Sequence, residues 1–374
     1  MASSPSPASV TSLRSEQHTP LLFTTNMGLE DVVVTEYQER AAAAGLTVSE
    51  TNDAPLGLRS YARVTVDAAP DAALAVAHDM RSVHHVLAPL YTFSLPVEED
   101  AGAVLETIYD TVRALDVEAM ETADTFRATT VRKGDHDFTS MDVQRVAGGA
   151  LDDRYGAAVD LEDHDVEVRV DVHDDRCLVS VQHTKEALSR RQARLFQPRA
   201  ALKPNVAYAL LRLSHRESPP NVVLDPFCGS GTILWEAGAL WPEAQLIGND
   251  WNEDTLAGAR QNADAQHLTD RATLHEADVW NLADTLGDTT ADLIVTNPPF
   301  GVRLGSSMDF FPFYRRVLGQ FASVLRPGGR VVMLVLRQGP FKNALGATES
   351  FNIRHVRVVE LGGLYPRVFV LGRR

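Results

Sequence analysis

The sequence predicts two structural parts: an α+β first half and, from about residue 205, a doubly wound α/β sheet with mainly parallel strands. Two observations support this division. Up to residue 204, short strands and helices follow one another without a fixed rhythm, whereas after residue 205 buried strands and helices alternate regularly to the end of the chain. Regular alternation is typical of parallel sheets, because each parallel pair of strands needs a crossover connection, usually a helix.

In the first half, apolar periodicity predicts four helices and five strands. The helices span residues 28–44, 71–79, 101–115 and 140–155, and the strands span residues 21–26, 58–66, 125–132, 165–172 and 177–183. The last two strands alternate apolar and polar residues on either side of the turn HDDR, which predicts an antiparallel hairpin. This mixture indicates an α+β region made of two small units.

In the second half, the same reasoning predicts five strands and three helices. The strands span residues 221–227, 244–250, 272–278, 291–297 and 330–336, and the helices span residues 232–240, 253–266 and 310–325. Sheets of this type bind ligands beyond the carboxyl ends of their strands. Glycine-rich and polar segments follow four of these strands, so we expect a ligand site at that edge of the sheet.

The composition excludes several classes of protein. With 44% hydrophobic and 23% charged residues, the chain is an ordinary globular protein rather than a fibrous one. No apolar segment approaches the length of a membrane span. Residues 1–20 are rich in Ser and Pro, which predicts a disordered tail rather than a secretory signal. Cys177 and Cys228 are too few for a metal site or a disulfide framework. We therefore expect a cytoplasmic protein without a bound metal.

The distribution of charge is more informative than the net charge of −15, which alone argues against a nucleic-acid partner. Eight Lys or Arg residues and one acid occur between residues 181 and 216, whereas residues 98–124 are strongly acidic. Leu195, Phe196 and Pro198 interrupt the basic run where the two halves join. At this point two interpretations stay open, a local nucleic-acid footprint and a solvated helix surface.

The segment DPFCGSGT (225–232) combines a strand end, two glycines and the start of a helix. Gly229 and Gly231 allow a ligand to approach the backbone, and the helix N-terminus supplies free N–H groups. Leu234 stands where a dinucleotide fingerprint needs a third small residue, and the loop has no Lys for cradling phosphates. The loop is therefore a poor match to either of those nucleotide-binding motifs.

Acidic residues follow the next two strands. Asp250 ends the strand of IGND, where a carboxylate can accept from both hydroxyls of a ribose, and Asp278 follows the strand after it, where it can accept from an adenine amino group. A glycine loop and two acids at three successive strand ends form the layout of a site for an adenosine-containing ligand.

The fourth strand end, NPPF (297–300), has the chemistry to activate an amine. An exocyclic purine amine is a poor nucleophile because its lone pair is delocalised into the ring. Asn297 and the carbonyl of Pro298 can accept its two hydrogens, and consecutive prolines hold that carbonyl rigidly. Phe300 can stack on the base. The alternative is a Pro-rich turn with a surface Phe, but the preceding glycine loop and acids favour catalysis by positioning and preorganisation.

Together, DPFCGSGT, Asp250, Asp278 and NPPFG resemble the class I S-adenosyl-L-methionine-dependent methyltransferases that act on amino nitrogens. The resemblance implies a Rossmann-like sheet of seven strands with a reversed last strand, for which YPRVFVLG (365–372) is the candidate. It implies that Asn297, Pro298 and Phe300 are catalytic. It also implies a set of residues that bind the cofactor: Asp225, Phe227, Gly229, Gly231, Thr232, Asp250, Trp251, Asp278, Val279 and Asn297. Carbon methyltransferases of this superfamily use a Pro-Cys nucleophile. This chain has no Cys at that position, so carbon methylation is not expected.

The first half resembles the N-terminal region of THUMP-domain RNA methyltransferases, in which a ferredoxin-like unit precedes a THUMP unit that grips the tRNA acceptor end. The resemblance lies in residues 28–39, 125–151 and 166–181, and residues 186–213 resemble the linker and first methyltransferase helix of the tRNA guanosine-N2 branch. It implies a disordered tail over 1–20, a ferredoxin-like domain over 21–75, a THUMP domain over 76–184, a basic linker over 185–204 and a methyltransferase domain over 205–374.

The resemblance implies methylation of N2 of a guanosine in the tRNA acceptor stem, of the position-6 type. Ribosomal RNA guanosine, DNA adenine and a vestigial methyltransferase half remain alternatives. We expect RNA contacts at Lys185, Arg190, Arg191, Arg194, Arg199, Lys203 and Arg303. Because the basic linker precedes the sheet, we expect the loss of a linker arginine to leave cofactor affinity unchanged.

Overall fold

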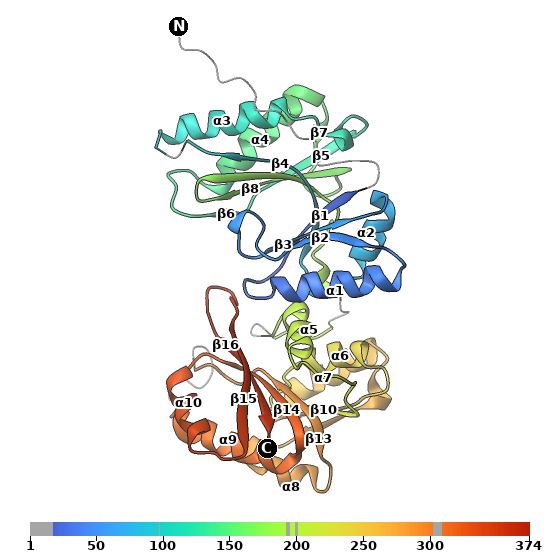
Figure 1. Ribbon diagram of the computed structural model, residues 1–374, viewed down its shortest axis with the longest axis vertical. Helices are drawn as coiled ribbons and strands as arrows, with labels where there is room; N and C mark the ends of the chain where they lie inside the picture. The colour runs from blue at the N-terminus through green and yellow to red at the C-terminus, as the bar shows by residue number, and fades with distance from the viewer. Residues whose placement is uncertain (1–17, 97, 192–194, 199–200, 302–308) are drawn as a thin grey trace. The chain divides into compact units, whose positions relative to one another are not determined.

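The computed structural model describes residues 18–96, 98–191, 195–198, 201–301 and 309–374 (Figure 1). It divides into two compact units. Among the described residues, unit 1 holds 18–24, 34–80 and 84–187, and unit 2 holds 25–33, 81–83 and 188–374. Arg194, Arg199 and Arg303, which the sequence predicts to contact RNA, lie outside the described residues.

Unit 1 is built on a nine-stranded sheet in the order β2-β3-β1-β4-β9-β8-β5-β7, with β6 paired to β8. The strands are β1 (Thr19–Thr24), β2 (Val48–Asn52), β3 (Tyr61–Val66), β4 (His85–Ser94), β5 (Thr125–Thr129), β6 (Arg132–Lys133), β7 (Ala158–Val159), β8 (Val166–His173) and β9 (Arg176–Gln182). The predicted hairpin of β8 and β9 is antiparallel, as expected. Pairing of β4 with both β1 and β9 joins the strands of residues 19–66 and 85–182 into one sheet.

Four helices belong to this part of the chain: α1 (Glu30–Ala43, whose residues up to Val33 are counted with unit 2), α2 (Pro70–His78), α3 (Ala101–Ala114) and α4 (Ser140–Tyr155). Helices α3 and α4 lie side by side on one face of the sheet (Figure 1). Their apolar residues Ile108 and Val143 share a core with Val168 and Val170 of β8. Thr139 caps α4 through a capping box with Asp142, which explains why this helix begins where the sequence predicts.

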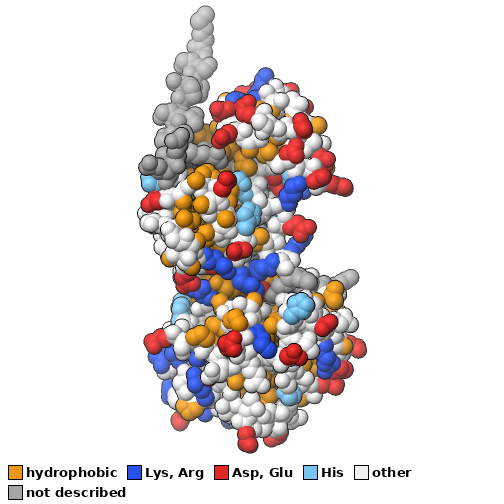
Figure 2. Space-filling model, turned by 90° about the vertical axis from the view of Figure 1, so that its right-hand side faces the viewer, with side chains coloured by type: hydrophobic (Ala, Val, Ile, Leu, Met, Phe, Trp, Pro, Cys, Tyr) orange, Lys and Arg blue, Asp and Glu red, His pale blue; other side chains and the backbone are white. Residues whose placement is uncertain are grey.

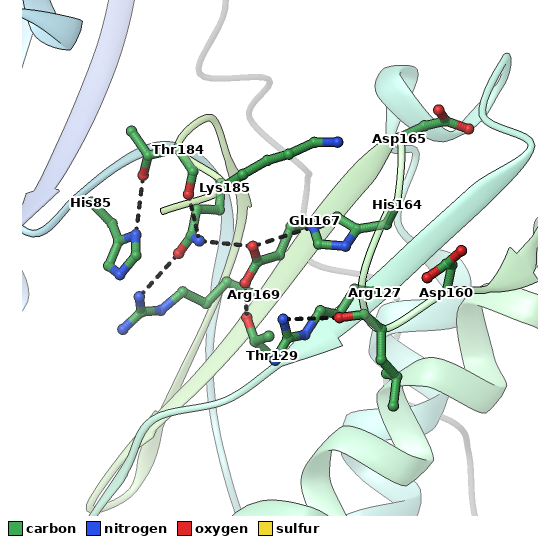
Figure 3. A network of polar contacts seen from close by, with 12 residues as sticks. His85, Arg127, Thr129, Asp160, His164, Asp165, Glu167, Arg169, Thr184 and Lys185 are labelled. Atoms are coloured by element: carbon green, nitrogen blue, oxygen red, sulfur yellow. Dashed lines mark hydrogen bonds and ion pairs between the residues drawn. The ribbon is translucent and has the colours of Figure 1, made fainter. Parts of the chain in front are cut away.

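The other face of β8 carries polar side chains that are nevertheless buried. Glu167, Arg169 and Asp171 follow one another at every second residue and are each less than 10% exposed. Arg169 donates from Nε to Asp171 Oδ2 at 2.7 Å, and Tyr61 donates to the same oxygen at 2.6 Å. Figure 3 shows the neighbouring part of this network, where Thr129 donates to Glu167. The buried charges of Arg169 and Asp171 are therefore neutralised within unit 1.

Unit 2 contains a seven-stranded sheet in the order β12-β11-β10-β13-β14-β16-β15. The strands are β10 (Val222–Asp225), β11 (Gln245–Asp250), β12 (Ala272–Glu276), β13 (Ala291–Thr296), β14 (Leu325–Val335), β15 (Phe351–Val358) and β16 (Arg367–Arg373). The first five strands are parallel, and β16 runs antiparallel to both β14 and β15. The expected seven-stranded sheet with a reversed last strand is confirmed.

Helices cover both faces of this sheet. They are α5 (Pro204–Arg212), α6 (Thr232–Leu240), α7 (Glu253–Ala265), α8 (Leu282–Leu286), α9 (Phe310–Val324) and α10 (Gln338–Gly346). One core contains Leu210, Leu234 and Leu256 of α5, α6 and α7, and the other contains Val317 and Phe341 of α9 and α10. This two-sided burial makes the central strands nearly uniformly apolar, which is why their sequences are easy to recognise.

Two N-terminal segments complete unit 2. Leu29 and Val32 pack in the same core as α5. Arg357 of β15 donates to both carboxylate oxygens of Asp31, at 2.5 and 2.8 Å. Unit 2 is therefore assembled with residues 25–33 and 81–83, which periodicity alone does not reveal.

Several boundaries differ from the sequence prediction for local reasons. Strand β1 begins at Thr19, two residues before the expected strand. Strand β4 was not predicted, because Pro89 interrupts its apolar run and the pairing with β9 shifts register beside it. Residues 326–329 (RPGG), which separate the expected helix over 310–325 from the expected strand over 330–336, are part of β14, where the register with β13 shifts between Ala291 and Leu293.

Among the described residues, no helix combines the length and apolar character needed to cross a membrane. On the face drawn in Figure 2, acidic side chains occur on both units.

Candidate active site at the carboxyl ends of four parallel strands

Four neighbouring parallel strands, β12, β11, β10 and β13, end at one edge of the unit 2 sheet. Each leads into one of the polar segments noted in the sequence. The glycine loop follows β10, Asp250 ends β11, Asp278 follows β12 and Asn297 follows β13. The fold thus brings together four segments that are far apart in the sequence.

The glycine loop has a shape that requires its glycines. Gly229 and Gly231 have φ angles of 52° and 81°, in the left-handed region. A Cβ atom on Gly231 would lie 2.2 Å from the ring of Trp235, so the close approach of that ring excludes any other residue. Trp235 also donates from Nε1 to the carbonyl of Ser230 at 2.8 Å. Helix α6 begins directly after the loop at Thr232.

Asp250 is bound to the glycine loop. Its Oδ2 accepts from the backbone N–H of Gly229 at 3.0 Å, and its Oδ1 accepts from the N–H of Asn252 at 3.1 Å. Burial raises the pKa of Asp250, and these two N–H groups oppose that shift. The side chain is partly exposed, so its remaining acceptor capacity is available to a ligand with hydroxyl groups.

Asp225 is enclosed by the protein, with 1% of its surface exposed. Its Oδ1 accepts from the Thr296 hydroxyl at 2.7 Å and from the N–H of Phe227 at 3.1 Å. Burial raises the pKa of Asp225 to about 7. The sequence resemblance suggested a direct cofactor contact, but in the structure this carboxyl ties the end of β10 to the end of β13.

Sequence reasoning missed Asn249, which joins three strand ends. This buried residue precedes Asp250, and its Nδ2 donates to the carbonyls of Pro226 and Ala277 at 3.3 and 3.0 Å. Its backbone carbonyl accepts from the N–H of Cys228 at 3.0 Å. The signal was present in the sequence as a polar residue inside the otherwise apolar strand of QLIGND.

The other predicted cofactor residues lie around the same edge. Asp278 is exposed and caps the short 3-10 helix η5 (Val279–Asn281) by accepting from the N–H of Trp280 at 3.0 Å. Trp251 is 73% exposed beside Asp250. The ring of Phe227 packs against the core beneath the site. The site therefore combines an open aromatic ring with an open carboxylate.

The segment NPPF presents a buried acceptor. Asn297 Oδ1 is buried and has no hydrogen-bond partner among the described residues. Pro298 is buried, and Phe300 is half-buried against the core that contains α6. Buried acceptors without a donor are uncommon in folded proteins, and they suggest a group supplied from outside. The amine of a substrate is such a donor.

These features fit a class I methyltransferase site. The glycine loop allows close backbone approach, Asp250 offers carboxylate oxygens for hydroxyl groups, and Asn297 offers an acceptor for an amine. The described residues contain no group of three or more His, Cys, Asp or Glu side chains that could hold a metal ion.

The structure changes the interpretation of one predicted RNA contact, Arg191. Its Nη2 donates to the buried carboxylate of Glu236 in α6 at 2.7 Å, and its Nη1 donates to the carbonyl of Leu188 at 3.1 Å. The same Glu236 oxygen accepts from Arg81 at 2.9 Å. Arg191 is thus part of an internal ion pair, and a phosphate would have to compete with a buried carboxylate for it.

The remaining described cations among the predicted RNA contacts are open to solvent. Arg190 and Lys203 are exposed. Lys185 is 63% exposed and lies 3.1 Å from Asp163, an exposed pair of the kind that contributes little to stability.

Comparison with known proteins agrees with this geometry. Residues 191–367 match the model of the RMKL-like methyltransferase domain, and residues 102–182 match the THUMP domain. A tRNA (guanine(6)-N2)-methyltransferase of Thermus thermophilus is 38% identical over 93% of this chain and 98% of its own length. One of Methanocaldococcus jannaschii is 29% identical over 73% of this chain and 83% of its own length.

A solved structure has a similar fold. TrmN from Thermus thermophilus superposes with a TM-score of 0.74 at 36% identity, covering 95% of this chain and 100% of that one. The similarity extends over both the α+β half and the parallel sheet. The chain belongs to the family of THUMP-domain methyltransferases.

Proposed function

We propose that this protein transfers a methyl group from S-adenosyl-L-methionine to N2 of the guanosine at position 6 of tRNA. The observation that carries the chemistry is the buried Oδ1 of Asn297 at the end of β13, which has no hydrogen-bond partner among the described residues. The choice of substrate is supported by the names of the relatives from Thermus thermophilus and Methanocaldococcus jannaschii.

The catalytic residues act on the amine. Asn297 Oδ1 and the carbonyl of Pro298 accept the two N2 hydrogens, which draws the nitrogen towards tetrahedral geometry and frees its lone pair. Two prolines in succession fix this carbonyl, since they restrict the backbone and remove N–H donors. Phe300 stacks on the base and holds it in line. Bound S-adenosyl-L-methionine supplies an electrophilic methyl group on sulfur.

The atoms of the reaction balance without an additional reagent. The bond from N2 to the methyl carbon forms as the bond from that carbon to sulfur breaks. The N2 nitrogen is briefly cationic and loses one proton to water. No strong base is required, because a methylated anilinium-like nitrogen is acidic. The contribution of the protein is therefore to position the groups and to preorganise the acceptors.

We assign the cofactor to the edge formed by β10, β11 and β12. Gly229, Gly231 and Thr232 line the methionine end, Asp250 accepts from the ribose hydroxyls, and Asp278 accepts from the adenine amine. Trp251 and Val279 flank the adenine. Asp225 and Phe227 support the loop from beneath.

We assign RNA binding to the first half of the chain and to the basic run. The sequence predicted a tail over 1–20, but β1 begins at Thr19, so we propose that the ferredoxin-like domain begins at Thr19 and extends to residue 75. The other proposed boundaries remain a THUMP domain over 76–184, a linker over 185–204 and a methyltransferase domain over 205–374. A paired base cannot reach Asn297, so the target guanosine is flipped out at a cost of a few kcal/mol.

We place the protein in the cytoplasm, since both of its cysteines are free and buried.

The test is methylation of defined transcripts by the purified protein. A tRNA transcript with guanosine at position 6 should yield N2-methylguanosine after digestion to nucleosides, whereas the same transcript with adenosine at position 6 should not. Methylation of a ribosomal RNA fragment in preference to tRNA would replace the proposed substrate. Cofactor binding without transfer to any RNA would favour a vestigial methyltransferase half.

A further inference from the structure

The linker between the halves of the chain is attached to the glycine loop by a single buried side chain. Asn262 of α7 is 1% exposed. Its Oδ1 accepts from the backbone N–H of Phe196 at 3.1 Å, and its Nδ2 donates to the carbonyl of Phe196 at 2.8 Å. The same Nδ2 donates to the carbonyl of Ser230, in the middle of the glycine loop, at 3.2 Å. One amide therefore binds the linker and the loop together.

The ring of Phe196 occupies a space that only glycine leaves open. A Cβ atom on Gly258, in the same helix as Asn262, would lie 2.1 Å from the nearest carbon of that ring. Gly258 lies inside a helix, where glycine is less favourable than alanine by about 1 kcal/mol. Glycine at position 258 therefore lowers the stability of α7, at the position where the ring of Phe196 packs against the helix.

The carbonyl of Ser230, to which Asn262 donates, connects the glycine loop to α6. Ser230 stands between two glycines with left-handed φ angles, and its carbonyl belongs to the peptide plane that leads into α6. Trp235 is the other donor to this carbonyl. If the linker moves, the shared Nδ2 group of Asn262 must follow Phe196 or stay with Ser230, and in either case one of its hydrogen bonds is lost.

A second contact joins the linker to α6. Arg191 pairs with Glu236, which is fully buried in α6, the helix that starts directly after the glycine loop. The linker is thus joined to Ser230 of the loop through Asn262, and it contacts the helix behind the loop directly at Glu236. The expectation that the linker is independent of the cofactor site does not agree with these contacts.

We propose that docking of the linker at Phe196 sets the affinity of the glycine loop for S-adenosyl-L-methionine, with Asn262 as the positioning residue that joins the two. The proposal rests on the assignment of this loop to the cofactor under the proposed function. Because coupling free energies are reciprocal, RNA that holds the linker in place will strengthen cofactor binding, and bound cofactor will strengthen RNA binding by the same factor.

The first test is Gly258→Ala, which forces the Phe196 ring out of its position without changing the loop. The dissociation constant for S-adenosyl-L-methionine, measured by calorimetry, should rise by about threefold to tenfold, as for the loss of one net hydrogen bond. The matched control is Gly319→Ala in α9, where an added Cβ meets nothing within 4 Å, and its affinity should match that of the parent protein. In steady-state kinetics, KM for the cofactor should rise in Gly258→Ala while kcat at saturation is retained.

The second test is a double-mutant cycle. Phe196→Ala removes the ring that Gly258→Ala displaces, so the double variant should bind the cofactor no more weakly than Phe196→Ala alone. Asn262→Asp keeps the acceptor for the Phe196 N–H and loses both donated bonds, so it should weaken cofactor binding even though the linker ring is intact.

The outcomes separate this inference from the proposed function. Parent protein that fails to bind S-adenosyl-L-methionine contradicts the function itself. Parent protein that binds, with unchanged affinity in folded Gly258→Ala and Asn262→Asp, overturns only the coupling. The rate of hydrogen exchange at the Phe196 amide reports whether the linker was released. Unchanged affinity for S-adenosyl-L-methionine contradicts the coupling, whether or not this exchange rate increases. Equal losses in Gly258→Ala and Gly319→Ala would also overturn it.

Discussion

Asp171 of unit 1 and the two aspartates at the site of unit 2 are satisfied in opposite ways, whereas Glu236 of unit 2, outside the site, is paired with arginines as Asp171 is. In unit 1, Asp171 accepts from Arg169 and Tyr61, so the chain itself supplies a cation and a hydroxyl. In unit 2, Asp225 and Asp250 accept only from backbone N–H groups and a hydroxyl, and no cation of the described chain pairs with either. The carboxylate of Asp171 is paired with a cation of the chain and needs no ligand. The carboxyl groups at the unit 2 site have no such cation among the described residues, so a ligand can supply the missing partner.

This difference distinguishes a supporting network from a site. A carboxylate paired with an arginine contributes mainly to the integrity of the fold, and its removal leaves an uncompensated partner. A carboxyl group that is buried without a cation has a raised pKa, and such groups concentrate at functional sites. The contrast gives a direct set of expectations for substitutions in the two units.

The largest effect is expected in unit 1. Arg169→Met keeps an apolar stem but removes the cation beside Asp171, and we expect the free energy of unfolding to fall by about 3–5 kcal/mol, measured by urea denaturation. The affinity of the folded variant for S-adenosyl-L-methionine should not change. Arg145→Met is the control, since this arginine is 72% exposed and its exposed pair with Asp142 should contribute little to stability. Equal losses in the two variants would contradict the claim that the buried pair of Arg169 and Asp171 supports the fold of unit 1 more than an exposed pair does.

The next effect depends on pH and concerns Asp225. Because the folded pKa is about 7 and the unfolded value is near 4, the folded protein keeps this proton while the unfolded chain releases it. The stability that this group contributes is complete below about pH 4 and is lost as the pH rises to about 7. Asp225→Asn has no proton to lose, so it should be more stable than the parent protein at pH 8, by up to about 4 kcal/mol.

The advantage of Asp225→Asn should disappear below about pH 4, where the parent carboxyl is protonated in both states. Denaturation curves of the two proteins at pH 4, 6 and 8 measure this difference directly. A constant difference across the range would show that Asp225 does not titrate between those values.

Most of unit 2 could be predicted from its sequence, because parallel strands buried on both faces are apolar runs bounded by turns. The positions of the four strand ends that form the site could be predicted from these apolar runs. What could not be predicted has a physical reason in each case. Strand β15 is an edge strand rich in Arg and His, and β4 contains Pro89 at a register shift.

The candidate site was predicted in outline but not in its internal contacts. Asp225 belongs to the glycine-loop motif, yet its carboxyl accepts from the hydroxyl of Thr296 at the end of the neighbouring strand β13. Arg191 belongs to a basic run, yet it pairs with Glu236, which is 45 residues away in the sequence. Pairings of this kind depend on tertiary contacts, and neither composition nor periodicity contains them.

A third expectation sharpens the role of Asp250. Asp250→Ala removes carboxylate acceptors, each worth about 1.5–3 kcal/mol to a ligand hydroxyl, so the affinity for S-adenosyl-L-methionine should fall at least tenfold. Asp250→Asn keeps one acceptor oxygen and should lose less. Glu253→Ala, which removes an exposed carboxylate at the start of α7, is the matched control. Unchanged affinity of Asp250→Ala by calorimetry would remove Asp250 from the cofactor site.

The smallest effect concerns the basic run. Arg190 is exposed, and if it contacts a phosphate, Arg190→Ala should lower the slope of log affinity for tRNA against log salt by about 0.7–0.9. Substrate and non-substrate tRNA should lose affinity alike, because phosphate contacts do not read sequence. Arg260→Ala is the control, since that arginine pairs with Glu253 at 2.6 Å. Arg191→Ala is unsuitable for this test because it also breaks a buried ion pair.

The central claim is that the buried acceptor of Asn297 activates a guanosine amine, and the single-turnover rate of Asn297→Ala tests it most directly. With tRNA and S-adenosyl-L-methionine both saturating, we expect the rate of methyl transfer to fall by about 10²–10³-fold, as when one preorganised group is removed from a transition state. Calorimetry should find the affinities for cofactor and tRNA unchanged, since the acceptor matters mainly as the amine becomes tetrahedral. A single-turnover rate within about threefold of the parent protein would contradict the account, because an acceptor that preorganises the transition state cannot be removed at so small a loss.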